Sequence, residues 1–203
     1  MILQPRRKDT LDLAFADAPW DKQSLGVYED IGRFAQTYLK PGRPILCYAG
    51  ALNLLDNGKR LEAEGLKYVT TFAIQFPSMH DQPKLNGLKL RNGWRPVLVF
   101  SKGKYQPGFW VDDSQDGLGP DKSEDRIQCN ELEVAYWLHR LSMPGDLVAS
   151  LCGGVFTEAV ACRRMGRHFV GCDPSARKCQ IGRERLEEVS AVHRGTLYTR
   201  WRG

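Results

Sequence analysis

Two short segments of the chain bring together side chains that could bind a ligand. The first is the turn Asp17-Ala18-Pro19-Trp20, which follows the apolar run Leu13–Ala16. It places a carboxylate, a small residue, a rigid proline and a large aromatic ring within four positions. Ligands of open α/β sheets bind beyond the carboxyl ends of the strands, so a turn of this composition after a strand is a candidate site.

The second segment is Gly153-Gly154, which follows the apolar run Val148–Leu151 and precedes a helical pattern. An acidic residue, Asp173, follows the next apolar run. In nucleotide-binding sheets such glycines let backbone N–H groups approach the ligand, and an acid at the next strand end binds ribose hydroxyls. The spacing therefore indicates a nucleotide-like ligand.

Each of these residues also has a purely structural interpretation. Two glycines before a helix most often form a tight turn, and an isolated aspartate such as Asp17 often caps a turn. Trp20 could be a core residue, and Asp173 could be the N-cap of the helix that follows it. The four histidines lack the spacing of metal ligands, so we expect no metal site.

The elements that would position these turns alternate along almost the whole chain. Short apolar runs are separated by helical patterns, which is typical of parallel strands joined by crossover helices. Strands are predicted at 11–16, 44–48, 68–74, 95–100, 146–151, 168–172 and 196–199, and helices at 28–39, 52–63, 131–141, 156–165 and 175–188. We therefore expect an α/β fold, with a doubly wound, mostly parallel, seven-stranded Rossmann-like sheet and helices on both faces.

Residues 102–127 interrupt this alternation with Gly, Pro, Asp, Lys and Ser and little periodicity. The segment is too long for an ordinary connection and is predicted to be a loop over a site. We therefore interpret residues 1–203 as a single domain, in which a first half (1–104) and a second half (131–203) are joined by a loop at 105–130.

Composition places the chain among globular proteins. Its 203 residues are 42% hydrophobic, and 29 Lys and Arg against 24 Asp and Glu give a net charge of +5. No stretch approaches the ~20 apolar residues of a membrane span, and the start lacks the apolar segment of a secretory signal. The six cysteines form no C-x-x-C pair. We therefore expect no membrane association and reduced thiols in a cytoplasmic protein.

Positive charge is concentrated near the carboxyl terminus. Residues 163–203 contain ten Lys and Arg against four Asp and Glu, with Tyr198 and Trp201 among them. Such a patch suits a phosphate backbone, but the alternating charges over 183–188 are also typical of a solvent-exposed helix. The patch alone leaves both interpretations open.

Taken in order, these segments resemble the S-adenosylmethionine-dependent DNA adenine-N6 methyltransferases, in the permuted order in which the catalytic motif precedes the cofactor motif. Residues 17–20 resemble D-P-P-[YFW], and residues 144–157 resemble P-G-D-x-V-L-D-P-F-x-G-x-G-T without a gap. The resemblance spans residues 11–186. Its other parts are the turn 39–44, similar to L-K-P-G-G, the strand 95–104 with its basic end, the segment 166–173, similar to L-G-R-x-x-[IV]-G-x-[DE], and Asp121-Lys122 with Gln128, similar to a stretch of the phage and plasmid type.

The resemblance implies methyl transfer from S-adenosylmethionine to the exocyclic N6 of adenine in DNA. The adenine would be flipped out of a duplex, or taken from a single strand, and stacked on Trp20. Asp17 and the Ala18 carbonyl would accept hydrogen bonds from the amine, and Pro19 belongs to the same motif. Catalysis would consist of positioning and electrostatics, without a covalent enzyme intermediate.

In the second half, the resemblance implies that Gly153 and Gly154 line the turn under S-adenosylmethionine and that Asp173 holds its ribose. Lys122 would pair with the cofactor's carboxylate, although a loop lysine is commonly only solvated. The same motif includes three further candidate cofactor-binding residues: Ser150, Cys152 and Thr157.

The sequence departs from the family's pattern where chemistry is expected. Ser150 replaces an Asp, Leu151 a Pro, Phe156 the second Gly and Ala18 the first Pro. A phenyl ring at Phe156 could occupy the methionine pocket, because glycine at such a turn leaves room for the ligand, and the sequence leaves open whether the ring points into the pocket or away from it. Ala18 keeps the backbone carbonyl but loses the fixed φ of proline.

Two interpretations of the function follow. One is an active adenine-N6 methyltransferase, which the side chains of Asp17, Pro19 and Trp20 favour. The other is a catalytically inactive methyltransferase-like subunit that binds DNA or a partner methyltransferase without using the cofactor, which Ser150 and Phe156 favour. Little chain is left for target recognition, so a homodimer or a partner methyltransferase subunit fits either interpretation.

Overall fold

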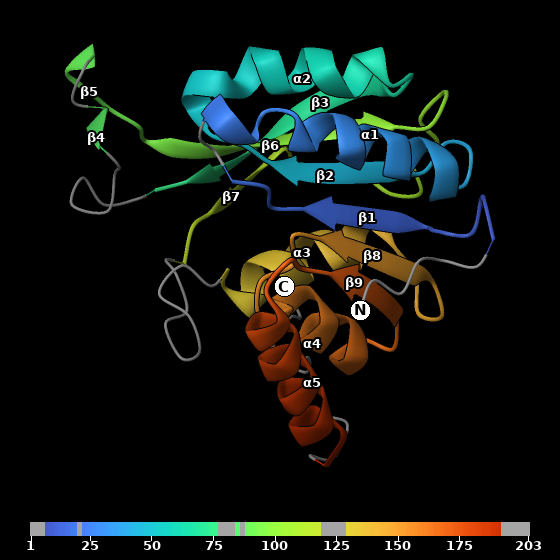
Figure 1. Ribbon diagram of the computed structural model, residues 1–203. Coiled ribbons are helices and arrows are strands. Elements are labelled where there is room, and N and C mark those ends of the chain that lie inside the picture. The colour runs from blue at the N-terminus through green and yellow to red at the C-terminus, as the bar shows by residue number, and fades with distance from the viewer. Residues whose placement is uncertain (1–6, 20–21, 77–83, 86–87, 119–128, 192–203) are drawn as a thin grey trace.

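The structure, a computed structural model, describes residues 7–19, 22–76, 84–85, 88–118 and 129–191. Within these residues, seven strands form one sheet with helices on both faces (Figure 1). The strands are β1 (Leu13–Ala16), β2 (Pro44–Tyr48), β3 (Lys67–Gln75), β6 (Trp94–Ser101), β7 (Ser114–Asp116), β8 (Leu147–Leu151) and β9 (His168–Cys172). A separate ribbon pairs β4 (Lys84–Leu85) with β5 (Leu90–Arg91).

The order of the strands across the sheet is β7-β3-β6-β2-β1-β8-β9. Strand β6 is antiparallel to its neighbours β2 and β3, and the other six strands point in the same direction. The predicted α/β fold with a mostly parallel, seven-stranded sheet is therefore confirmed. Because six strands are parallel, their carboxyl ends lie at one edge of the sheet and their amino ends at the opposite edge.

The outermost strand on one side of the sheet was not predicted. Residues 114–116 form β7 inside the segment expected to be a loop, and Ala73 and Ile74 of β3 pair with Ser114 and Gln115. Ser, Gln and Asp have low strand propensity, so pairing with an existing strand outweighs the local preference. The predicted strand at 196–199 lies outside the described residues.

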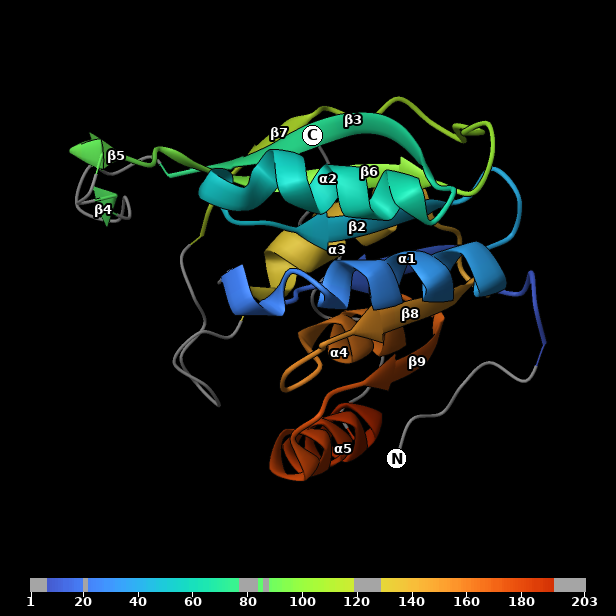
Figure 2. The same cartoon turned by 45° about the horizontal axis from the view of Figure 1, so that its top comes forward.

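Helices cover the two faces in separate groups. Helices α1 (Val27–Tyr38) and α2 (Leu54–Ala63) lie on one face, and α3 (Glu131–Leu141), α4 (Thr157–Arg164) and α5 (Ala176–Ala191) on the other (Figure 2). Short 3-10 helices, η1 (Lys22–Ser24) and η2 (Ala51–Asn53), precede α1 and α2. In the described part of the chain, none of these helices has the length and apolar character needed to cross a membrane.

The apolar pattern of the sequence explains this arrangement. The buried residues of α1 are Tyr28, Ile31, Gly32 and Ala35, whose spacing places them on one side of a helix. Strands β1 and β2 are buried along their whole length, as expected for strands that helices cover on both faces. Trp137 of α3 is fully buried in the core between this helix and the sheet.

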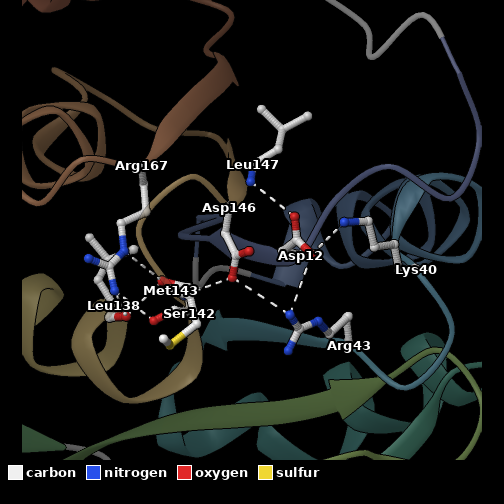
Figure 3. A network of polar contacts seen from close by, with 9 residues as sticks. All are labelled: Asp12, Lys40, Arg43, Leu138, Ser142, Met143, Asp146, Leu147 and Arg167. Carbon is white, nitrogen blue, oxygen red and sulfur yellow. Dashed lines mark hydrogen bonds and ion pairs between the residues drawn. The ribbon is translucent and has the colours of Figure 1, made fainter. Parts of the chain in front are cut away.

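Charged residues join the strands at the amino edge of the sheet (Figure 3). The buried Asp12, just before β1, accepts hydrogen bonds from Lys40 Nζ at 2.7 Å and from the backbone N–H of Leu147 at 3.0 Å. Arg43, just before β2, lies 3.4 Å from Asp12 and 3.6 Å from Asp146, just before β8. These contacts hold the first residues of three adjacent strands together.

A second part of the same region centres on Arg167 (Figure 3). Its side chain donates to the backbone carbonyls of Leu138, Ser142 and Met165 at 3.3, 2.6 and 2.8 Å. Arg167 therefore joins the end of α3 to the start of β9. The segments 39–44, 144–147 and 166–167, which contribute to the family resemblance, thus stabilise the amino edge, opposite the candidate turns.

Candidate functional site

The two turns predicted from the sequence lie next to each other at the carboxyl edge of the sheet. Strand β1 pairs with β8 so that Ala16 lies opposite Leu151, and the backbone N–H of Asp17 donates to the Leu151 carbonyl at 3.2 Å. The N–H of Gly153 donates to the Cys172 carbonyl at 3.1 Å, which brings in the end of β9. The structure therefore gathers the turns after β1, β8 and β9 into one site.

Asp173 holds the glycine turn to the start of α5. Its Oδ2 accepts a hydrogen bond from the N–H of Gly154 at 2.9 Å, and its Oδ1 accepts one from the N–H of Ser175 at 2.8 Å. Ser175 is the residue that caps α5, because its Oγ accepts from the N–H of Lys178 at 3.3 Å. Asp173 is therefore not the N-cap, and each of its oxygens keeps a lone pair for a further hydrogen bond.

Three residues of the turn have positive φ: Cys152 at 55°, Gly154 at 56° and Phe156 at 57°. Glycine adopts this left-handed conformation freely, whereas a residue with a Cβ pays about 1–2 kcal/mol. Position 156 is thus one at which glycine is the favoured residue. Other contacts of Phe156 must offset the cost of its left-handed backbone conformation.

The ring of Phe156 lies in the core between β9, α4 and α5, where its exposed fraction is 7%. A Cβ atom at Gly182 of α5 would lie 2.5 Å from its Cδ2, and one at Gly171 of β9 would lie 2.7 Å from its Cε1. The ring also meets the edge of Phe169, with centroids 6.0 Å apart. The ring is therefore a packing residue beneath the turn, and it also fills the space at Gly153, where a Cβ would lie 2.7 Å from its Cδ1.

The remaining candidates of the cofactor motif differ in exposure. Cys152 is half-buried, and burial, together with Cys172, Asp173 and Asp17, raises the pKa of its thiol to about 11. It is therefore a neutral thiol near pH 7 rather than a nucleophile. Thr157 is buried, and its hydroxyl accepts from Arg185 of α5 at 3.4 Å.

Ser150 is buried on β8, and its Oγ has no hydrogen-bond partner among the described residues. In the catalytic motif, Asp17 is half-buried, Ala18 is buried against the core of α1 and Pro19 is exposed. Trp20 and Lys122 lie outside the described residues.

Four polar residues beneath the turns, Tyr48, Arg95, Glu133 and Glu158, were not found from the sequence. With Ser150 they form what we call the interior polar cluster. The Arg95 guanidinium donates to Glu133 Oε2 at 2.5 Å and lies 5.1 Å from the centre of the Tyr48 ring. The Tyr48 hydroxyl, Arg95 Nε and Glu158 Oε2 have no hydrogen-bond partner in the described part of the chain.

Two signals in the sequence point to members of this cluster. Tyr48 is the last residue of a predicted strand, so it lies at the same end of the sheet as Asp17, which follows another predicted strand. Glu158 is the charged residue in the otherwise apolar run 158–162. A carboxylate is rarely buried without a partner, so an acid in an apolar helical run is also a candidate functional residue.

Burial dominates the electrostatics of Glu158. Loss of water raises its pKa to about 7, and the negative charge of Asp17 contributes in the same direction. The Glu158 backbone, Arg185 and the Ser150 hydroxyl act in the opposite direction. Burial also raises the pKa of Tyr48 well above its usual value. Near neutral pH the tyrosine is therefore neutral, and Glu158 is close to half protonated.

The described residues offer binding groups for an organic ligand rather than for a metal. No group of three or more His, Cys, Asp or Glu side chains in the described ranges could hold a metal ion. The N–H groups of Gly153 and Gly154 donate within the protein, to the Cys172 carbonyl and to Asp173, but the Cβ position of Gly154 has no atom within 4 Å. This open side of the turn lies next to Asp17 and Asp173.

Comparison with known proteins identifies the fold. No protein-family model matches the sequence, and no curated protein matches it significantly. Among solved structures, M1.HpyAVI in complex with SAM is 17% identical, with a TM-score of 0.71 over 87% of this chain and 89% of that one. PvuII DNA methyltransferase, described as cytosine-N4-specific, is 13% identical, with a TM-score of 0.72 over 91% and 85%.

A third similar structure is a protein of Thermus thermophilus complexed with S-adenosyl-L-methionine. It is 15% identical, with a TM-score of 0.73 over 90% of this chain and 88% of that one. At these identities the likeness shows the fold, which this chain shares along most of its length with DNA methyltransferases.

Proposed function

We propose that this protein transfers a methyl group from S-adenosylmethionine to an exocyclic amino group of a base in DNA, with adenine N6 as the acceptor. The observation that carries the proposal is the adjacency of the Asp17 turn and the glycine turn at one edge of the sheet. A donor at the glycine turn and an amine at Asp17 would be side by side, as direct transfer requires. The choice of adenine rests on the sequence resemblance.

The residues around the glycine turn fit S-adenosylmethionine. Gly154 leaves open space for the close approach of a ligand, and Asp173 has acceptor capacity left for ribose hydroxyls. The Phe156 ring fills the Cβ position of Gly153, whereas the Cβ position of Gly154 has no atom within 4 Å and is the open side of the turn. When bound, S-adenosylmethionine supplies an electrophilic methyl group.

The residues of the first turn would orient the acceptor. The Asp17 carboxylate accepts a hydrogen bond from the amino group, and the Ala18 carbonyl accepts a second one. Together they direct the nitrogen lone pair toward the donor side of the site. Preorganised acceptors of this kind act without moving during the reaction.

The proposal is tested in two steps. Calorimetric titration with S-adenosylmethionine and with its demethylated product should show binding by the unmodified protein. Incubation with the donor and with duplex or single-stranded DNA should then give N6-methyladenine, which mass spectrometry distinguishes from N4-methylcytosine. Replacement Asp17→Ala should lower transfer at saturating donor by roughly 100-fold or more, beyond any loss of donor binding.

The second candidate function is an inactive subunit that binds DNA or a partner methyltransferase. Ser150 favours it, because a serine stands where the family's motif has an acid. Phe156 does not favour it, since the ring belongs to the core. Absence of donor binding, together with binding to DNA, would support this second function and contradict the first.

A further inference from the structure

A buried carboxyl group beneath the turns has no part in the transfer as proposed. Glu158 lies in the first turn of α4 with an exposed fraction of 4%, and its Oε2 has no hydrogen-bond partner in the described ranges. Most buried polar groups in proteins are hydrogen-bonded, so an exception of this kind requires an explanation.

Ser150 links Glu158 to the site. Ser150 lies opposite Phe15 of β1, and the Phe15 side chain packs on the face that α3 and α4 cover. The Ser150 side chain therefore points to α4, two residues before the glycine turn. Its hydroxyl is near enough to Glu158 to lower the pKa of the carboxyl, but its Oγ makes no hydrogen bond of good geometry. Ser150 Oγ and Glu158 Oε2, two buried atoms without a well-formed hydrogen bond among the described residues, thus lie near each other under the strand ends.

Charged groups face Glu158 from two elements. Asp17, after β1, raises the pKa of Glu158, and Arg185, on α5, lowers it. Arg185 is engaged elsewhere, because its guanidinium donates to the Val155 carbonyl at 2.7 Å. Burial is the main reason that Glu158 keeps its proton, and the negative charge of Asp17 makes a second negative charge there still less favourable while the site is empty.

The other titratable groups that face Glu158 are Tyr48 of β2, Cys129 before α3 and Cys162 of α4. Burial raises the pKa of each of them. All three are therefore uncharged near neutral pH. Asp17 and Arg185 are the charges that shift the pKa of Glu158, and the paired ions Arg95 and Glu133 lie in the same interior polar cluster.

We propose that Glu158 is a positioning residue that balances charge at the site: it holds a proton while no donor is bound and releases it when the positively charged methionine part of the donor binds beside Asp17 and Ser150. The inference rests on the proposed function, because S-adenosylmethionine carries a positive ammonium group and a positive sulfonium group. A positive charge near a carboxyl favours its ionised form.

The proton balance is simple. The O–H bond of the Glu158 carboxyl breaks, its electron pair stays on the carboxylate, and the proton passes to the solvent buffer. The unpaired Ser150 hydroxyl can then donate to the new carboxylate. This arrangement accounts for the serine on β8, because an acid at position 150 would bring a third carboxyl group next to Glu158 and Asp17.

The experiment measures protons released when the donor binds. Calorimetric titrations at pH 6.0 are repeated in buffers that differ in ionisation enthalpy, and the slope gives the number of protons per donor. At pH 6.0, one unit below a pKa of about 7, roughly nine-tenths of Glu158 is protonated, so release of about half a proton or more is expected. Glu158→Gln, which keeps the size of the side chain, should remove this release.

A matched control is Glu131→Gln. Glu131 also lies in the first turn of a helix, but its carboxylate pairs with Arg164 at 2.7 Å, on α4. This variant should release as many protons as the unmodified protein. Between pH 6 and pH 8, donor affinity should rise about tenfold in the unmodified protein relative to Glu158→Gln, because the cost of ionising Glu158 disappears.

The demethylated product locates the responsible charge, since it keeps the ammonium and lacks the sulfonium. Equal release with both ligands assigns the effect to the ammonium, and a smaller release with the product assigns it to the sulfonium. Donor binding with equal proton release in the unmodified protein and in Glu158→Gln would overturn the inference and leave the proposed function standing. Failure of the donor to bind at either pH would overturn both.

Discussion

Burial of one ionisable side chain connects the stability of this protein to pH. The pKa of Glu158 is raised from 4.5 to about 7 in the folded protein, so the folded state binds more protons than the unfolded state between these values. The stability that this group contributes is present below pH 4.5 and is lost as the pH rises through 7. The loss is on the order of 3 kcal/mol, because one pKa unit corresponds to about 1.4 kcal/mol.

We therefore expect Glu158→Gln, which carries no charge at any pH, to gain stability relative to the unmodified protein as the pH rises from 5 to 8. Urea unfolding of both proteins at several pH values measures the difference and removes the contribution of all other carboxyl groups. A difference that does not change with pH would contradict the raised pKa of Glu158.

Phe156 has an unfavourable backbone conformation, but its ring packs closely against α5 and β9. The left-handed φ disfavours it, and two glycines on neighbouring elements, Gly171 and Gly182, provide the space for its ring. Glycine inside a helix such as α5 costs about 0.5–1 kcal/mol relative to alanine. Packing of the ring against Gly182 offsets the lower helix propensity of this glycine.

Substitution at these positions should be strongly coupled. Gly182→Ala should destabilise the protein despite the better helix propensity of alanine, because the new Cβ would lie 2.5 Å from the Phe156 ring. In a protein that already carries Phe156→Gly, the same Gly182→Ala change should be neutral or stabilising. The interaction energy in this double-mutant cycle should be about 1–3 kcal/mol by urea unfolding, and additive effects would contradict the observed packing.

At the scale of elements, the amino edge of the sheet depends on Asp12. This buried carboxylate binds Lys40, Arg43 and the first backbone N–H of β8, so its removal would leave their donors unpaired. We expect Asp12→Ala to lower the free energy of unfolding by about 3 kcal/mol, the low end for a broken buried pair, because both cations are partly exposed.

The control for this prediction is Asp30→Ala, which removes an exposed carboxylate that pairs with Arg33 of the same helix. Exposed pairs contribute about 0–1 kcal/mol, so this variant should be nearly as stable as the unmodified protein. Similar losses in the two variants would show that Asp12 does not hold the strands together.

Periodicity predicts the elements of this fold well where the local pattern and the tertiary contacts agree. The helix at 131–141 and the strand at 44–48 appear at the expected residues, because their apolar spacing matches the faces that they bury. Strand β7 was missed because its residues have no strand pattern and gain their pairing from β3. The position of Phe156 depends on glycines far along the chain, Gly171 and Gly182, which no local pattern reveals.

The site was predictable in its outline for a related reason. Turns after parallel strands must meet at one edge, so Asp17 and the glycine turn could be placed together from the sequence. For Glu158 and Tyr48 the sequence offers only weak signals, an acid in an apolar run and a tyrosine at a strand end, because their missing partners become visible only in the folded protein. The residues that resemble a family motif also divide in space, with some at the site and others, such as Arg167, at the opposite edge.

At the scale of the whole molecule, the contacts that stabilise the sheet and the candidate site lie at opposite ends of its strands. The charged network joins the strands at the amino edge, whereas the carboxyl edge leaves Ser150 Oγ and Glu158 Oε2 without hydrogen bonds among the described residues. Unpaired buried groups of this kind cost about 1–3 kcal/mol each. Binding of a donor at the carboxyl edge should therefore stabilise the whole protein, since the ligand binds only the folded chain.

The magnitude of that stabilisation follows from mass action. Free S-adenosylmethionine at 100 times its dissociation constant should add about 2.7 kcal/mol to the free energy of unfolding. For a chain of this length, 1 kcal/mol corresponds to about 2–4 °C, so the Tm should rise by roughly 5–11 °C. Thermal unfolding with and without the donor measures the shift. Asp173→Ala at the glycine turn should reduce the shift at the same donor concentration, whereas Asp30→Ala on α1 should leave it unchanged. An equal shift in all three proteins would place the donor away from the glycine turn.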